Sequence, residues 1–416
     1  MKILFLAPYI YDQSLPEFQR NGTGFGIMVK DIFDSVSAKT EAYLLTQVIT
    51  RGHDCGILKH TWKDVFLSAR LKDWIFGIRD FIKYRQSFSM RCRYLYYELN
   101  AGTVRKIIKN NHPDVVHIHG LGTQEYPFIR ICKEQKVPYV VTLHGLIGLD
   151  ESIDAPKWDK DLERVFLINA DKDGVPVTVI STGMKRRIEE YYLHQESTNI
   201  AVVCNGTRIP SDKNISNRER LDLRKEFGIQ NEKVAVVIGS ICDNKNQMQI
   251  IRAMSIGIEE NPYHLFLCGL DMTDGRIQQI IDEVNLNGKA HVLGFLSHEE
   301  LCDVLNQADL NIVASKNEGF GLSIIEAFTH GVPTVSFSDL DAIPDLYNEK
   351  AMIIVNRRGD LDLSLGIDAG LKKDWDKTWI REYSKRFSLE RVAQSYLHEY
   401  EKVLSKRTDD KNNLVY

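Results

Sequence analysis

Short apolar segments alternate along this chain with longer segments in which apolar residues recur at helical spacing. The short segments are rich in β-branched residues, which predicts buried strands joined by crossover helices. In the first half of the chain the predicted strands cover residues 1–7, 41–46, 114–118, 138–143, 176–181 and 200–204. In the second half they cover about 233–239, 264–269, 290–293, 309–314, 333–337 and 351–355. This alternation is typical of α/β folds with parallel sheets.

The two series of strands predict two doubly wound, Rossmann-like domains. The 416 residues exceed what one hydrophobic core usually supports. We place the boundary after Gly206, because the next residues are polar and contain Pro210. The expected domains are therefore residues 1–206 and 207–378, and a helical segment over 379–405 could cross back onto the first domain. Such sheets bind ligands at the carboxyl ends of their strands, so we expect the domains to face a central cleft that suits a two-substrate reaction.

Composition and charge exclude several classes of protein. Apolar residues make up 43% and charged residues 26%, as in ordinary globular proteins. A net charge of −4 provides no global field to attract nucleic acid. The seven cysteines have no CxxC spacing, which predicts neither a disulfide framework nor a zinc site and fits the cytoplasm. No stretch approaches the roughly 20 apolar residues of a membrane-spanning helix.

The stretch from Ser315 to Pro333 carries the most informative chemistry. A predicted strand runs into a glycine-containing turn, and a helix is expected to begin near Leu322. Free backbone N–H groups and the positive end of the helix dipole make such a turn an anion site. Glu318 lies at the turn and Glu326 about one helical turn further in, so both carboxylates can face one ligand. Carboxylates readily accept hydrogen bonds from the vicinal hydroxyls of a sugar or ribose.

This stretch resembles the signature of the family-4, or group 1, retaining glycosyltransferases, which have the GT-B fold. The signature is a Glu, seven residues and a second Glu within EGFG-x-x-x-x-E-A, and the resemblance covers nearly the whole chain. It implies that Glu326 holds the nucleotide ribose and that Glu318 lies against the hydroxyls of the donor sugar. It also implies that Gly319 belongs to the donor site and that Ser323 lies near the phosphates. The main-chain groups of Phe320, Gly321 and Leu322 would bind the sugar.

A second loop, which begins at Gly239 and Ser240, matches the family only in part. The family usually has an arginine and a lysine here, and both neutralise the donor diphosphate. Lys245 is kept, whereas Ser240 replaces the arginine, so one charge-assisted contact is missing. Either another cation, such as Arg208 or Arg186, substitutes for it, or the site depends more on backbone donors.

In the first domain, a glycine-rich loop and a histidine also match the family. The loop Asn21-Gly22-Thr23-Gly24-Phe25-Gly26 precedes a helical segment, and the resemblance implies that Gly24 reaches the donor phosphates. It lies too far beyond the first strand for a dinucleotide-binding fingerprint. His144 follows a strand that should end at the cleft, where an imidazole can exchange protons with a substrate hydroxyl. His117 and His119 are expected to be structural, since alternation sends one of them into the core.

Residues 59–93 carry nine Lys or Arg against three Asp or Glu, interleaved with aromatic residues. One interpretation is a basic amphipathic surface that makes peripheral contact with an anionic membrane or receives a lipid-linked acceptor. The other is a pair of helices whose aromatic side chains fill the core and whose cations are solvated. The sequence leaves both open and slightly favours the second.

The predicted activity is transfer of a hexosyl-type unit from a nucleoside-diphosphate sugar to a hydroxyl of a glycan, lipid-linked or small-molecule acceptor. The configuration of the sugar would be retained, and cell-surface polysaccharide or glycoconjugate synthesis is the expected setting. The expected catalytic residues are His144, Glu318 and Lys245, the first choice of donor is a UDP-sugar, and no cofactor or metal is required. Two alternatives remain: a sugar-nucleotide epimerase or phosphorylase of the same fold, and a catalytically silent binding subunit, which the missing arginine at Ser240 would favour.

Overall fold

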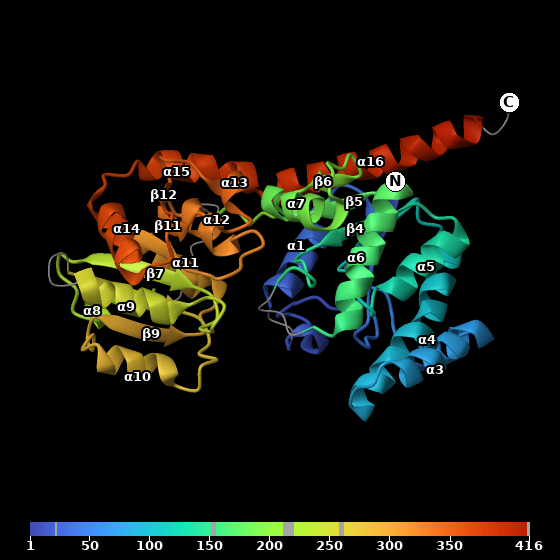
Figure 1. Cartoon of the computed structure of the whole chain (residues 1–416), viewed down its shortest axis with the longest axis horizontal. Helices are drawn as coiled ribbons and strands as arrows, with labels where there is room; N and C mark the ends of the chain where they lie inside the picture. The colour runs from blue at the N-terminus through green and yellow to red at the C-terminus, as the bar shows by residue number, and fades with distance from the viewer. Residues whose placement is uncertain (21–22, 151–154, 211–219, 258–261, 414–416) are drawn as a thin grey trace. The chain divides into compact units, whose positions relative to one another are not determined.

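The computed structural model describes residues 1–20, 23–150, 155–210, 220–257 and 262–413. The chain divides into two compact units, of which unit 1 is Met1–Asn205 with Leu389–Tyr416 and unit 2 is Gly206–Ser388. Each unit is an α/β structure built around one six-stranded parallel sheet (Figure 1). Among the described residues, no helix is long and apolar enough to cross a membrane.

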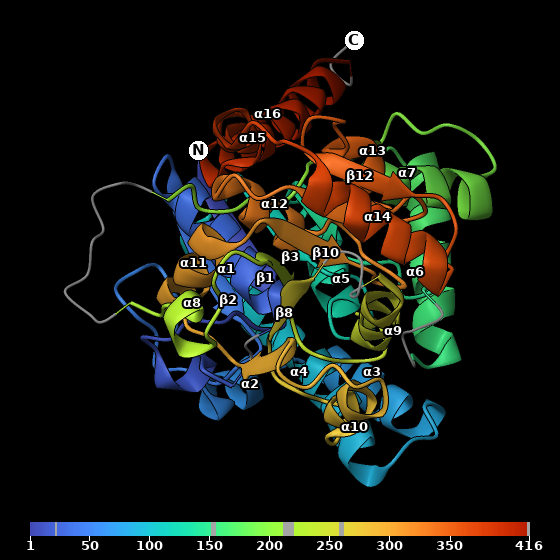
Figure 2. The ribbon, with the colours of Figure 1, turned by 90° about the vertical axis from the view of Figure 1, so that its left-hand side faces the viewer.

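The sheet of unit 1 has the strand order β2-β1-β3-β4-β5-β6. Its strands are β1 (Lys2–Ala7), β2 (Glu41–Thr46), β3 (Val115–His119), β4 (Tyr139–Leu143), β5 (Val177–Val179) and β6 (Ile200–Val202). Its helices are α1 (Gly24–Ser37), α2 (Trp62–Ser68), α3 (Leu71–Lys83), α4 (Phe88–Asn111), α5 (Tyr126–Gln135), α6 (Lys157–Lys172), α7 (Thr182–Ile188) and α16 (Leu389–Asn413), with a 3-10 turn at Pro16–Phe18 and a π-helical turn at Glu189–Leu193. Helices α2 and α3 both pack against α4 at one end of the unit (Figures 1 and 2).

The sheet of unit 2 has the order β12-β11-β10-β7-β8-β9. Its strands are β7 (Lys233–Ile238), β8 (Tyr263–Cys268), β9 (Ala290–Gly294), β10 (Leu310–Val313), β11 (Thr334–Phe337) and β12 (Met352–Val355). Its helices are α8 (Leu223–Glu226), α9 (Gln247–Gly257), α10 (Arg276–Glu283), α11 (His298–Gln307), α12 (Leu322–Thr329), α13 (Ile343–Leu346), α14 (Asp360–Lys372) and α15 (Lys377–Ser384), followed by a 3-10 turn at Lys385–Phe387. All twelve predicted strands are therefore confirmed, as is the predicted fold class.

The strands read as continuous apolar runs because each sheet is covered on both faces. On β7, Ala235 and Val237 belong to one buried cluster, to which α9, α10 and α14 contribute. Val234 and Val236, which alternate with them, belong to a second cluster shared with α8, α11 and α12. Successive side chains of a strand point to opposite faces, so a strand covered on both faces has no polar side.

The prediction of one helical segment over 379–405 was wrong, because the chain forms two helices there. α15 ends at Ser384 in unit 2, and α16 begins at Leu389 in unit 1, with Ser388 extended between them. Phe387 is buried in unit 2 against the ring of Phe320, at a centroid distance of 6.1 Å. The extended residue lets each helix follow the core of its own unit, so the part that reaches unit 1 starts at Leu389.

Helix α16 is an integral part of the core of unit 1. Tyr396 and Tyr400 are fully buried, and the hydroxyl of Tyr400 lies 2.6 Å from His117 Nδ1. His117 Nε2 in turn lies 2.6 Å from Thr142 Oγ1, so both ring nitrogens have partners. The expectation that alternation sends only one of His117 and His119 into the core was wrong: both are buried, since residues two apart on a strand share a face.

We predict that Tyr400→Phe lowers the free energy of unfolding by about 1–3 kcal/mol, because His117 Nδ1 loses its partner in a site without water access. Tyr347→Phe is the matched control, since Tyr347 is exposed, and should change stability by less than about 0.5 kcal/mol. Urea unfolding followed by circular dichroism measures both. Equal stability of the two variants would contradict this role of α16.

Candidate active site

The clearest candidate site in unit 2 lies where its strand order changes direction. β7 and β10 are neighbours in the sheet, yet the chain continues from β7 toward β8 on one side and from β10 toward β11 on the other. At such a switch point the loops that follow the two strands separate and leave room for a ligand. The loops here are residues 239–246 after β7 and 314–321 after β10.

The side chain and backbone of Asn244 hold these two loops together. Its Oδ1 accepts a hydrogen bond from the backbone N–H of Asn317 at 3.1 Å, and its Nδ2 donates to the carbonyl of Asn317 at 3.1 Å. The backbone N–H of Lys316 donates to the carbonyl of Asn244 at 2.7 Å. Sequence reasoning missed this role of Asn244, because an Asn in a polar loop has no distinctive spacing.

Glycines allow the backbone to take the shape that the site needs. Gly321 caps α12 with a φ of +80°, a conformation that side chains with a Cβ rarely adopt. A Cβ added to Gly269 would lie 2.1 Å from the carbonyl oxygen of Gly239, so only glycine fits where the loops after β7 and β8 touch. The predicted start of the helix at Leu322 is confirmed.

Three donors converge on the carboxylate of Glu318. Lys245 Nζ forms an ion pair with Glu318 Oε2, and Ser315 Oγ lies 3.3 Å from the same oxygen. The backbone N–H of Gly321, at the start of α12, donates to Glu318 Oε1 at 3.2 Å. A cation, a hydroxyl and a helix N-terminus thus surround one anionic group, which is the arrangement that binds phosphate in other proteins.

The other donor-binding residues predicted in unit 2 lie around this cluster. Ser323 is buried in the first turn of α12, and Glu326 is half-buried in the second turn. The ring of Phe320 is buried, so only its backbone remains for a ligand. Ser240 is exposed, and its carbonyl accepts a hydrogen bond from Gln247 Nε2 at 2.9 Å.

Arg358 is a cation of this region that the sequence reasoning missed. Its guanidinium donates to the carbonyl of Ser315 at 3.0 Å and forms a bidentate pair with Asp339 at 2.7 and 2.8 Å. It also covers the ring of Phe337 at 4.6 Å. Arg358 therefore holds the loop after β10 from the side of β12, and the charge it brings is shared with Asp339.

Unit 1 has a pocket of about 500 Å³ at its own switch point, beyond the carboxyl ends of β1, β3 and β4. The predicted residue His144 lines it, together with Phe25, which directly follows the predicted Gly24. Gly24 starts α1, whose N-cap is the side chain of Thr23. Asn21 and Gly22 of the predicted glycine-rich loop lie outside the described residues.

His144 is a neutral imidazole in this pocket. Its Nε2 lies 2.9 Å from His119 Nδ1, and its ring meets the ring of Phe25 edge-on at 5.0 Å. Burial lowers the pKa of His144 to about 4, because the charged form loses its hydration. At neutral pH it can therefore accept or donate a hydrogen bond to a ligand, but it is a weak base.

Two carboxyl groups that the sequence reasoning did not single out line the same pocket. Glu125 is 1% exposed, and its Oε1 has no hydrogen-bond partner among the described residues. Burial, with the nearby Asp159 in second place, raises the pKa of Glu125 to about 8. A Cβ on Gly122 would lie 3.3 Å from Glu125 Oε2 and 3.7 Å from Asp159 Oδ1, so the glycine leaves space beside both carboxyl groups.

The described lining of this pocket has no cation beside these acids. Its lining contains four aromatic side chains and the neutral His144, but neither lysine nor arginine: Pro8, Tyr9, Phe25, Met90, Tyr94, Tyr97, Gly120, Leu121, Gly122, Thr123, Gln124, Glu125, Leu143, His144, Gly145, Ile147, Pro156 and Asp159. Such a lining suits an uncharged, hydroxyl-bearing ligand and disfavours an anion. Within the described ranges, no group of three or more His, Cys, Asp or Glu side chains could hold a metal ion.

Comparison with known protein families gives two matches in succession along the chain. Residues 41–209 match the family model described as Glycosyltransferase Family 4, and residues 219–385 match the model described as Glycosyl transferases group 1. Together they span most of the chain. The chain therefore belongs to the group 1, or family-4, glycosyltransferases of the GT-B fold.

Individual relatives agree with this assignment. A glycosyltransferase of Methanocaldococcus jannaschii is 25% identical over 68% of this chain and 71% of its own. The GDP-mannose:cellobiosyl-diphosphopolyprenol alpha-mannosyltransferase of Xanthomonas campestris is 22% identical over 70% of this chain and 74% of its own. Among solved structures, Anabaena HepE in complex with UDP-glucose has the same fold, with a TM-score of 0.64 at 18% identity over 98% of this chain and all of its own.

The raised pKa of Glu125 predicts a pH-dependent stability. Below about pH 4.5 the carboxyl group is protonated in both states, so it has no effect. Between pH 4.5 and 8 the unfolded chain loses the proton that the folded chain keeps, so the free energy of unfolding falls with rising pH, by at most about 1.4 kcal/mol per pH unit. Glu125→Gln should lack this component.

Urea unfolding at a series of pH values, with wild type and variant compared at each, isolates the contribution of Glu125. Glu190→Gln, at an exposed glutamate of the same unit, is the control and should follow the wild-type profile. A Glu125→Gln profile parallel to that of the wild type would show that this carboxyl group ionises normally in the folded protein.

Proposed function

We propose that this glycosyltransferase transfers a sugar from a nucleoside-diphosphate donor, with retention of configuration and without a metal ion. The observation that carries the proposal is the convergence of Lys245, Ser315 Oγ and the Gly321 N–H on one carboxylate. A site that holds one anion with a cation, a hydroxyl and a helix N-terminus is suited to hold the diphosphate of a donor.

Donor binding would proceed as an exchange of partners. The diphosphate takes Lys245 from Glu318, and the freed carboxylate of Glu318 accepts hydrogen bonds from the hydroxyls of the donor sugar. Glu326, in the second turn of α12, binds the ribose, and the backbone of residues 319–322 binds the sugar. Ser323 lies toward the phosphates, and the phosphate-binding role of Gly24 in unit 1 stays a prediction from the sequence.

Stabilisation of the leaving group is the main catalytic effect that we propose. Departure of the nucleoside diphosphate develops negative charge, which Lys245 and the N-terminal N–H groups of α12 meet from fixed positions. These groups supply the neutralisation that a divalent cation supplies elsewhere, which supports metal independence. Besides Glu318, the two loops of the donor site contain one carboxylate, Asp243, whose side chain is exposed. We therefore favour a front-face reaction in which the leaving phosphate accepts the proton of the acceptor hydroxyl.

The acceptor is proposed to bind in the pocket of unit 1. Its aromatic side chains can cover the apolar faces of a sugar ring, and Glu125, protonated at neutral pH, can donate to a hydroxyl or ring oxygen. His144 is placed to orient the attacking hydroxyl rather than to take its proton, because its pKa is about 4. The Xanthomonas relative, whose name gives a polyprenol-linked glycan as acceptor, supports a glycan or lipid-linked acceptor. A role in cell-surface polysaccharide synthesis at the cytoplasmic side of the membrane stays a proposal from the sequence.

A UDP-sugar is the proposed donor, and the Anabaena structure with UDP-glucose supports this choice. The Xanthomonas relative is named for GDP-mannose, so the base has to be tested directly. A thermal-shift panel of UDP-, GDP- and ADP-sugars does so, because a ligand that binds only the folded state raises its stability.

For the donor that this panel selects, we predict that Lys245→Ala weakens binding about tenfold to a hundredfold, the value of a charge-assisted hydrogen bond of about 1.5–3 kcal/mol. Lys372→Ala, which removes an exposed lysine from α14, is the matched control and should bind as the wild type does. Isothermal titration calorimetry measures both dissociation constants.

Unchanged donor binding by Lys245→Ala would refute the proposed donor site. Product analysis with and without acceptor then separates the remaining activities. A glycosylated acceptor of unchanged anomeric configuration indicates the retaining transferase, a changed sugar nucleotide without acceptor indicates an epimerase, and binding without any turnover indicates a silent subunit.

The charge of the acceptor pocket gives a prediction about specificity. An uncharged acceptor should be used with a kcat/KM about tenfold or more above that of the same sugar carrying a phosphate, because a phosphate would lie beside the carboxyl group of Asp159 with no lysine or arginine in the described lining. Asp159→Asn should reduce this preference, and Asp161→Asn on the same helix should not. Preference for the phosphorylated sugar by the wild type would contradict the pocket assignment while leaving the donor site intact.

A further inference from the structure

Helix α3 presents its apolar side chains to the outside of unit 1. Leu71, Ile75, Ile78 and Ile82 recur at spacings of three or four residues and therefore form one stripe along the helix. Their exposed fractions are 78%, 57%, 50% and 64%. A helix on the surface of a globular protein normally turns such a stripe inward.

The inner face of α3 is the polar one. Asp73 and Asp80 are buried, with Gly77 between them. The guanidinium of Arg105 on α4 binds both carboxylate oxygens of Asp73 at 2.9 Å each. Removing one partner of a buried pair leaves an uncompensated charge, so this bidentate pair fixes the helix with its apolar stripe outward.

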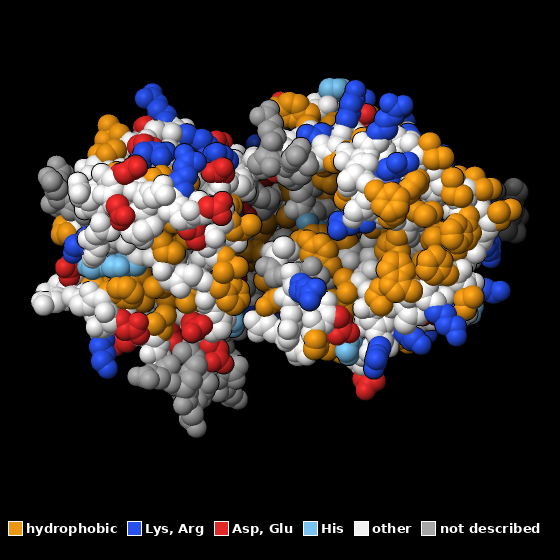
Figure 3. All heavy atoms as spheres, turned by 90° about the horizontal axis from the view of Figure 1, so that it is seen from below, with side chains coloured by type: hydrophobic (Ala, Val, Ile, Leu, Met, Phe, Trp, Pro, Cys, Tyr) orange, Lys and Arg blue, Asp and Glu red, His pale blue; other side chains and the backbone are white. Residues whose placement is uncertain are grey.

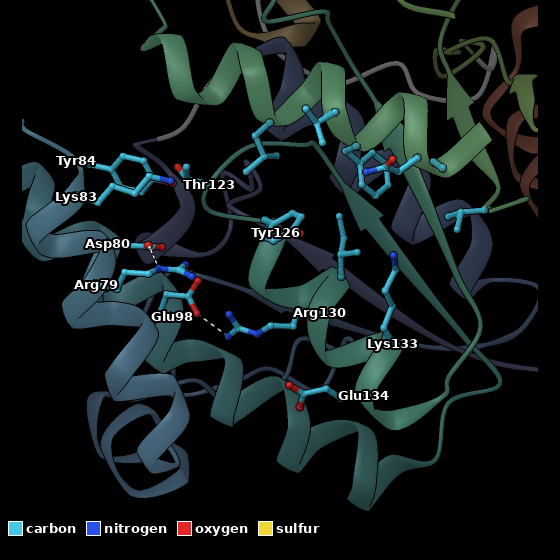
Figure 4. Close-up of a pocket in the computed structure, with 17 residues that line it drawn as sticks. Arg79, Asp80, Lys83, Tyr84, Glu98, Thr123, Tyr126, Arg130, Lys133 and Glu134 are labelled. Atoms are coloured by element: carbon cyan, nitrogen blue, oxygen red, sulfur yellow. Dashed lines mark hydrogen bonds and ion pairs between the residues drawn. The ribbon is translucent and has the colours of Figure 1, made fainter. Parts of the chain in front are cut away.

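Further ion pairs lie beneath α3, between this helix and its neighbours. Arg130 on α5 lies 2.5 Å from Glu98 on α4, and Arg79 Nε lies 2.8 Å from Asp80 Oδ1. Figure 4 shows these two pairs lining the pocket between α3, α5 and α6. Acids and cations are thus paired along the inner side of α3, although apolar side chains such as Val165 and Phe166 of α6 also line the pocket beneath it.

Aromatic side chains extend the stripe into a continuous surface, which we name the α2–α3 surface. Phe66 of α2 stacks on Trp62 and on Trp74 of α3, with centroid distances of 6.2 Å each. Phe88, at the start of α4, meets Phe81 at 6.0 Å. Trp62, Phe66 and Phe88 are exposed, so the interpretation in which the aromatic residues of 59–93 fill the core was wrong for these three.

The charges around the α2–α3 surface are of one sign. Every exposed charged side chain between Trp62 and Arg93 is a cation: Lys63, Arg70, Arg79, Lys83, Arg85 and Arg93. The three acids of this stretch, Asp64, Asp73 and Asp80, are buried or half-buried. Figure 3 shows the hydrophobic side chains gathered on this face with Lys and Arg around them.

We propose that the α2–α3 surface is a docking site for an anionic lipid membrane. The apolar stripe would enter the boundary between headgroups and acyl chains, with α3 parallel to the membrane plane, and the surrounding cations would bind anionic headgroups. A second copy of the chain is a poorer occupant, because it would bring the same cations against one another. The proposal does not depend on the donor or acceptor assignment.

Vesicle flotation tests the proposal with the full chain. It should float with vesicles of equal parts phosphatidylglycerol and phosphatidylcholine, and only weakly with phosphatidylcholine alone. The triple variant Ile75→Gln, Ile78→Gln and Ile82→Gln should lose binding to the anionic vesicles by about tenfold or more, since each change removes apolar side-chain surface from the stripe. High salt should weaken binding by the wild type.

The matched control is Leu361→Gln with Leu365→Gln, two leucines one turn apart on α14 that are 58% and 61% exposed. This variant should float as the wild type does. The α3 variant alters exposed side chains only, so its circular dichroism and its donor-induced thermal shift should match the wild type and exclude misfolding. Equal flotation by the α3 variant and the wild type, or none by either, would overturn the proposal. A dimer in analytical ultracentrifugation that the α3 changes dissociate would assign the surface to a second copy instead.

Discussion

Burial of each sheet on both faces is the constraint on which the rest of this structure depends. Alternate residues of β7 enter two separate cores, so a strand has no face left for a ligand and only its ends remain. In unit 2 this places the donor residues on the loops after β7 and β10, which diverge at the switch point and are tied together by Asn244. In unit 1 the same constraint gathers His144 and Glu125 from loops far apart in sequence at the ends of β3 and β4. Both candidate sites are therefore products of one mode of packing.

The two sites differ in charge, so each one favours a different ligand. The donor site already holds an anion, since Glu318 occupies the place between Lys245 and the start of α12. A ligand with more negative charge than one carboxylate can displace it at little cost, because each ion that is separated gains a new partner. The described lining of the pocket in unit 1 has carboxyl groups and no lysine or arginine, so a phosphate would find no cationic partner there. A diphosphate and a neutral hydroxyl compound would thus each find one suitable site.

Much of the fold could be predicted from the sequence, because strands covered on both faces produce uninterrupted apolar runs that need no knowledge of tertiary contacts. The start of α12 could be predicted for a similar reason, since Gly321 and the residues around it are a local signal. Glu125 and Asp159 could not, because they belong to different loops and helices and acquire their raised pKa values only through shared burial. The break at Ser388 was missed because the helical spacing continues through it, although a serine directly before Leu389 and Glu390 is a candidate N-cap. The two helices separate because Phe387 and Tyr396 are buried in different cores.

The orientation of α3 shows a further limit of sequence patterns, and it is also the strongest reason to look for an occupant of that surface. An amphipathic pattern establishes that a helix has two unlike faces, but the partner elements decide which face is inside. Burying an aliphatic side chain is worth about 1.5–3 kcal/mol, so four such side chains facing water forgo several kcal/mol. The pair of Asp73 with Arg105 does not offset this by itself, since a buried ion pair contributes little net stability compared with apolar residues of similar volume. A helix held with its apolar face outward is therefore costly to the isolated protein, and that cost is recovered only when an apolar medium covers the stripe.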